Sequence, residues 1–116
     1  MFRFEKLNAW QEAIEISDEL FDIADEVDSK RLFRFAEQLR GAALSISNNI
    51  AEGSGSFSNK DFANYLNIAR RSVFECANIL IILHRRKIII EEVKTGLLFK
   101  LDRLSRQITT FRKTLI

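Results

Sequence analysis

Few residues in this sequence are of types that carry out chemistry. There is one histidine, His84, and one cysteine, Cys76, too few to assemble a zinc site. Two carboxylates, Glu52 and Glu75, could together bind a metal or act as acid and base. A structural role for each is favoured, because the chain lacks the Glu-x-x-His pattern of di-iron bundles. The sequence therefore predicts no enzyme, no metal site and no cofactor.

A segment rich in glycine and serine, residues 45–62, is the second place where chemistry could occur. A phosphate-binding loop would need G-x-x-x-x-G-K-[S/T] after a strand, whereas here Phe57 follows the glycines and no strand is predicted before them. We interpret the segment as a joint between the second and third predicted helices, with Gly53 in the left-handed conformation that ends the second helix. Four polar residues are predicted to lie together there, the first two capping or bridging the joint: Asn49, Glu52, Ser72 and Glu75.

Basic residues are concentrated in the second half of the chain. Residues 1–58 contain six Lys or Arg and eleven Asp or Glu, a balance of −5, whereas residues 59–116 contain twelve and five, a balance of +7. This asymmetry favours self-association or an anionic partner. A simpler interpretation of the cluster at residues 85–87 is that it stabilises the negative end of a helix dipole. The candidate phosphate-contacting cations are Arg85, Arg86, Lys87, Arg103, Arg106, Arg112 and Lys113.

The elements that must position these residues are predicted to be helices. Apolar residues recur at alternating spacings of three and four, which keeps them on one side of a helix. Two-residue alternation is absent at useful length, and the chain has no proline. Four such stripes with short connections predict an all-α fold, a single antiparallel up-down four-helix bundle in one domain over residues 1–116. The helices are expected near residues 6–28, 31–52, 58–84 and 91–115, and Ser58 with Asp61 is expected to cap the third.

Three segments carry a resemblance to a known family. They are FEKLNAWQEA at residues 4–13, EQLRGAALSISNNIAEG at 37–53 and FANYLNIARRSVFE at 62–75. Together they resemble the four-helix-bundle proteins of the 23S rRNA intervening-sequence family, which are encoded within bacterial large-subunit ribosomal RNA genes. The resemblance implies a homopentamer without enzymatic activity. It also implies RNA association, from the genomic setting and from related accessory proteins of diversity-generating retroelements.

The chain departs from the family pattern in three places. Arg71 stands where a glycine usually precedes Ser72, which puts a bulky charge at a close-packing position. Ser56 stands where an arginine is common, so the joint lacks a cation that could bind phosphate. The proline often found ahead of the second helix is absent.

Self-association is also predicted from the residues themselves. An acidic stripe on the first helix is expected to face basic residues of a neighbour, and residues 79–83 are apolar on more sides than one core requires. The acidic stripe consists of Glu12, Glu15, Glu19, Asp22 and Glu26.

Two functions follow from these expectations. In the first, the protein is a non-enzymatic oligomer that associates with RNA or a ribonucleoprotein through phosphate contacts. In the second, it is a structural or protein-partner module whose charges serve assembly. No apolar run reaches the ~18 residues of a membrane span, and the N-terminus lacks the pattern of a signal peptide, so a cytoplasmic protein is expected. The sequence does not identify the RNA or the partner.

Overall fold

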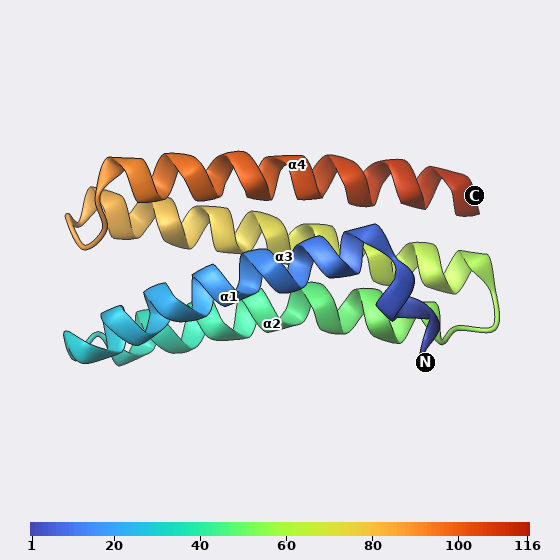
Figure 1. Ribbon diagram of the computed structural model, residues 1–116, viewed down its shortest axis with the longest axis horizontal. Coiled ribbons are helices and arrows are strands. Elements are labelled where there is room, and N and C mark those ends of the chain that lie inside the picture. Colours follow the sequence, from blue (N-terminus) through green and yellow to red (C-terminus); the bar gives the residue numbers. More distant parts are fainter.

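The computed structural model describes all of residues 1–116 as a bundle of four long helices preceded by one 3-10 turn (Figure 1). Successive helices run in opposite directions, so the all-α up-down bundle is confirmed. Each helix begins and ends within two residues of its predicted bounds. The elements are η1 Arg3–Lys6, α1 Asn8–Ser29, α2 Phe33–Ser54, α3 Asn59–Arg85 and α4 Glu91–Leu115.

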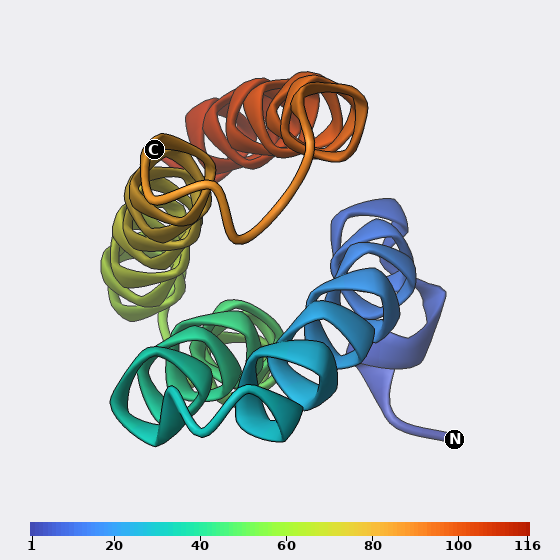
Figure 2. The same ribbon diagram turned by 90° about the vertical axis from the view of Figure 1, so that its left-hand side faces the viewer.

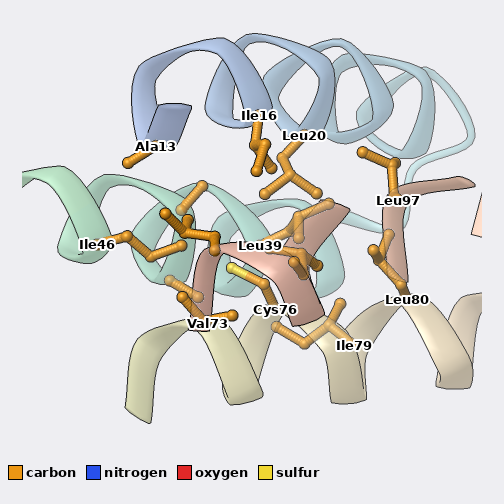
Figure 3. Close-up of a cluster of buried hydrophobic side chains, with 14 of the residues drawn as sticks. Ala13, Ile16, Leu20, Leu39, Ile46, Val73, Cys76, Ile79, Leu80 and Leu97 are labelled. Carbon is orange, nitrogen blue, oxygen red and sulfur yellow. The ribbon is translucent and has the colours of Figure 1, made fainter. Parts of the chain in front are cut away.

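The apolar stripes of the four helices form one continuous core. Leu20, Leu39, Leu66 and Leu104, one from each helix, are completely buried. Cys76 lies among these apolar side chains (Figure 3), and burial raises the pKa of its thiol to about 12. The thiol is therefore a small core residue, as its place in the apolar stripe of α3 predicts.

Consecutive helices pack closely, whereas the first and last helices do not. The end-on view shows α1 and α4 farther apart than the other neighbours (Figure 2), and they make the fewest contacts of any adjacent pair. Two ion pairs connect them, Arg103 with Glu12 and Lys100 with Glu19, the latter at 2.8 Å. The bundle thus has two layers, α1 with α2 and α3 with α4, which are joined mainly by the α2–α3 contact.

The glycine and serine segment forms the joint between α2 and α3, with one expectation confirmed and one wrong. Ser58 caps α3, because its hydroxyl accepts a hydrogen bond from the Asp61 N–H at 3.1 Å. Gly53 is not left-handed: it lies inside α2, and no glycine in the chain has a positive φ. A Cβ on Gly53 would lie 2.7 Å from Tyr65 Cβ and 2.8 Å from Phe62 Cδ1. Glycine is required here because α2 and α3 approach closely, a reason that only the tertiary structure reveals.

No helix in the structure is both long and apolar enough to span a membrane.

Candidate functional site

Two turns that are far apart in the sequence meet at one end of the bundle. The α1–α2 turn and the α3–α4 connection are both at the left end of the bundle in Figure 1. The Lys30 ammonium group donates a hydrogen bond at 3.3 Å to the carbonyl of Ile88, a residue 58 positions away. This contact brings together two basic segments, residues 30–34 and 85–87.

The α1–α2 turn has the hydrogen-bond pattern of a Schellman motif. The Leu32 N–H donates to the Val27 carbonyl at 3.2 Å, and the Arg31 N–H donates to the Asp28 carbonyl at 2.8 Å. Leu32 then packs against the core as the apolar residue that usually accompanies this motif. The motif places Arg31 in the left-handed region, with a φ of 63°.

The α3–α4 connection repeats the same motif. The Ile88 N–H donates to the Leu83 carbonyl and the Lys87 N–H to the His84 carbonyl, both at 2.9 Å. Ile88 packs against the core, and Lys87 has a φ of 62°. Arg31 and Lys87 are the two non-glycine residues of the chain with a positive φ. Glycine is the residue usually found at this position, because other residues are strained there.

These turns gather what we call the basic end cluster. Its six cations come from both turns and the first turn of α2, all are exposed, and none forms a salt bridge with a carboxylate. Its members are Lys30, Arg31, Arg34, Arg85, Arg86 and Lys87.

Compensation of helix dipoles explains part of this cluster. Cations near the C-termini of α1 and α3 are stabilised by the negative ends of those helices, as the simpler interpretation of residues 85–87 predicts. Arg34 lies instead in the first turn of α2, where the helix dipole disfavours a positive charge. Helix stability alone therefore does not account for six cations at this end.

Three of the neighbouring carboxylates, Asp25, Asp28 and Glu91, are engaged by other cations. Arg40 binds Asp28 at 2.8 Å and Asp25 at 2.7 Å, and the hydrogen bond that it donates to Asp25 raises the pKa of the Arg40 guanidinium. Glu91 lies 3.3 Å from Lys94 and 3.1 Å from His84. The hydrogen bond from Lys94 lowers the pKa of the Glu91 carboxyl. Glu26, Glu37 and Glu92 also lie near this end, are exposed and form no ion pair, so they offset part of the charge of the cluster.

Two candidate cations of α4 are exposed but already paired. Arg103 donates from its guanidinium to the Glu12 carboxylate on α1, and Arg106 binds Asp102 at 2.9 Å within α4. The Arg103 contact connects α4 to Glu12 of the acidic stripe within one chain, whereas the stripe was expected to face basic residues of a neighbour. These side chains are less available to an outside anion than those of the basic end cluster.

Arg112 and Lys113 lie at the other end of the bundle, near the α2–α3 joint. The Arg112 side chain donates at 3.1 Å to the backbone carbonyl of Ala63 and is half-buried. Lys113 is exposed and has no carboxylate partner. The seven predicted cations are thus distributed over three places, and Arg85, Arg86 and Lys87 are the three that lie at one end with Lys30, Arg31 and Arg34.

The predicted polar group at the joint forms in a different way from the one expected. The Asn49 amide donates at 2.7 Å to the Ser45 carbonyl, and the Ser45 and Ser72 hydroxyls are hydrogen-bonded at 2.8 Å between α2 and α3. Glu52 and Glu75 are exposed and form no hydrogen bond or salt bridge, so the expected capping by Glu52 is wrong. Gly55 ends α2 without help from a carboxylate, since its own N–H bonds to backbone carbonyls.

The largest surface cavity, about 480 Å³, lies between the start of α1 and the end of α4. Lys6 is its one ionisable side chain, and the remaining lining includes Leu7, Gln107 and Phe111. Nowhere in the structure do three His, Cys, Asp or Glu side chains come close enough to hold a metal ion.

Sequence analysis missed half of the basic end cluster. Lys30, Arg31 and Arg34 were not among the candidate cations, although KRLFR at residues 30–34 holds as many cations as residues 85–87. The pairing of the two turns could have been anticipated, because an up-down bundle places its first and third connections at the same end.

Two comparisons bear on identity. The sequence profile of the family described as 23S rRNA-intervening sequence protein matches residues 5–110. The fold is similar to the crystal structure of a protein of unknown function from the S23 ribosomal protein family of Bacteroides thetaiotaomicron VPI-5482, with a TM-score of 0.86 and 23% identity. The alignment covers 90% of this chain and 98% of that chain, and at this identity it shows the fold alone. A comparison with curated proteins gives no match.

Proposed function

The chain belongs to the family of 23S rRNA-intervening sequence proteins, and from this premise we propose that it is a non-enzymatic homo-oligomer that binds RNA through phosphate groups. The binding surface is the basic end cluster. The observation that carries the proposal is the presence of six exposed cations at one end of the bundle, with no carboxylate paired to any of them.

The chemistry of this surface suits a polyanion better than a small anion. Its cations extend into solvent from two turns and surround no enclosed pocket, so they can follow a chain of phosphates. Phosphate contacts supply affinity without reading sequence. Base stacking has little support, because Phe33 is the single large aromatic residue exposed beside the cluster.

Oligomerisation would bring several weak RNA-binding surfaces together in one assembly. Each copy presents one cluster, and several linked clusters raise the effective concentration of the others once one has bound. A homopentamer is proposed on the resemblance to the family alone. Such an assembly would bind a long RNA far more tightly than a single copy.

A second function is favoured by a different observation. Arg103 and Lys100 of α4 pair with acids of α1, so part of the positive charge already serves the protein itself. In this alternative the remaining cations contact a protein partner or a neighbouring copy, and the wild type shows no affinity for RNA even at low salt.

The test is the salt dependence of binding to a single-stranded RNA. If each site neutralises four to six phosphates, log K should fall against log salt with a slope of about −3 to −4. Replacing Arg85, Arg86 and Lys87 by Gln should weaken binding and reduce the slope by about 2.

The matched control removes the same charge elsewhere. Lys60, Arg71 and Lys113 are exposed, form no salt bridge and lie outside the basic end cluster. Their replacement by Gln should change the slope far less. Equal effects of the two triple variants, or no binding by the wild type, would overturn the proposed site.

A further inference from the structure

The two layers of the bundle carry opposite net charge. Residues 1–58 have a balance of −5 and form the α1–α2 layer, while residues 59–116 have a balance of +7 and form the α3–α4 layer. The two layers lie on opposite sides of the end-on view (Figure 2). One side of the molecule is therefore complementary in charge to the other side of a second copy.

The acidic side is formed by the outer surfaces of α1 and α2. Ile14 and Phe21, seven residues apart and partly exposed, lie on the same side of α1 as the exposed Asp18. On α2, Leu44 is 51% exposed and lies one turn from Arg40, which reaches α1. We call the outer surface formed by these apolar residues with Asp18 and Glu37 the acidic face.

The basic side is formed by the outer surfaces of α3 and α4. A shallow cavity of about 220 Å³ opens between these helices, and its lining is mostly apolar, with Val73 and Leu101 at its base. Phe74 borders it and is 55% exposed, with the Arg70 guanidinium 4.8 Å above its ring. We call this surface, with Ile81 and Leu98 and with Arg106 paired to Asp102 at its edge, the basic face.

We infer that the acidic face of one copy packs on the basic face of the next. Each face combines partly exposed apolar side chains with charges of a single predominant sign, which is what an interface between copies requires. Because the two faces are different surfaces on opposite sides of one chain, the contact is head-to-tail and generates a ring when the rotation closes. This inference rests on the self-association in the proposed function and names the surfaces that produce it.

The basic end cluster stays free in such an assembly. Its cations lie at the end of the helices, whereas both faces lie along their sides. Every copy of a head-to-tail ring would then present its basic end cluster on the same side of the ring.

The experiment is a charge exchange read by sedimentation velocity. The acidic-face variant, Asp18→Arg with Glu37→Arg, and the basic-face variant, Arg70→Glu with Arg106→Glu, should each raise the apparent dissociation constant about a hundredfold, because like charges then meet. Combining all four substitutions should restore assembly, since the faces are again complementary.

A matched control reverses charges on a third side. Glu52→Arg with Glu75→Arg changes two exposed, unpaired carboxylates on the α2–α3 side and should leave assembly unchanged. A wild type that sediments as a monomer at micromolar concentration would overturn both this inference and the proposed oligomer. A wild-type oligomer that both face variants leave intact, or that the control disrupts equally, would overturn only the assignment of the faces.

Discussion

The chain reverses direction between helices at both ends of the bundle, but different residue types are used at the two ends. At the α2–α3 joint, Gly53 lies within a regular helix, where its missing side chain lets α2 approach Phe62. At the other end, two Schellman motifs need a left-handed residue, and the chain uses Arg31 and Lys87. Glycine is thus present where packing requires it and absent where backbone conformation would favour it.

This difference bears on which positions serve folding and which serve the proposed function. A residue held in a strained conformation costs stability, so the choice of Arg31 and Lys87 over glycine fits the proposed use of their side chains in binding. The glycine-rich joint has a sufficient structural explanation, whereas the basic end cluster does not. The predictions below test this contrast, beginning with the largest expected effect.

Gly53→Ala should destabilise the fold by about 2–3 kcal/mol. The added methyl group would meet the buried ring of Phe62 and the base of Tyr65 at less than 3 Å, and these groups are anchored in α3. Chemical denaturation measures the effect. Gly41→Ala is the matched control, because nothing lies within 4 Å of its Cβ position, and it should stabilise α2 by about 0.5–1 kcal/mol. Equal effects would show that Gly53 has no packing role.

Ser72→Ala should cost about 1 kcal/mol, because it removes the hydrogen bond that joins α2 to α3 through Ser45. The double variant Ser45→Ala with Ser72→Ala should cost less than the sum of the two single variants, since both report on one bond. Additive losses would mean that the two hydroxyls act independently.

Arg31→Gly with Lys87→Gly should separate stability from binding at the basic end. Glycine relieves the left-handed strain, so the free energy of unfolding should rise by about 0.5–1 kcal/mol, even though glycine also increases the entropy of the unfolded chain. RNA affinity should fall, because two cations are lost. Arg31→Gln with Lys87→Gln removes the same charge without relieving the strain. A loss of stability in the glycine variant would contradict the contrast between the ends.

Glu52→Ala should change stability by less than about 0.5 kcal/mol, as expected for an exposed residue without a partner. Comparing the thermal unfolding of this variant with that of Gly53→Ala would show how differently the two adjacent residues contribute to stability. A loss as large as that of the glycine variant would restore a capping role for the carboxylate.

The fold could be predicted from the sequence because its determinants are local. The spacing of apolar residues follows the helical repeat, and the buried stripes of all four helices agree with it. The family was also identified correctly from three segments of the chain. The site was harder to predict, because it depends on contacts between distant residues.

Three examples show why. Lys30 meets Ile88 across 58 positions, so the basic end cluster exists only after folding. Arg103 is hydrogen-bonded to Glu12, 91 positions away, so a cation that the sequence leaves unpaired instead connects α4 to α1. Gly53 was assigned to a turn because glycine often ends helices, whereas the ring of Phe62 that excludes a side chain there belongs to another helix.

Lysine acetylation footprinting with RNA, read by mass spectrometry, tests the central claim most directly. Lys30 and Lys87 belong to the basic end cluster, while Lys60 and Lys113 are exposed near the α2–α3 joint. All four are compared in one sample, so each end serves as the control for the other. Bound RNA should protect Lys30 and Lys87 from acetylation and leave Lys60 and Lys113 reactive. Protection of Lys60 and Lys113 instead, or equal protection at both ends, would contradict the assignment of RNA binding to the basic end cluster.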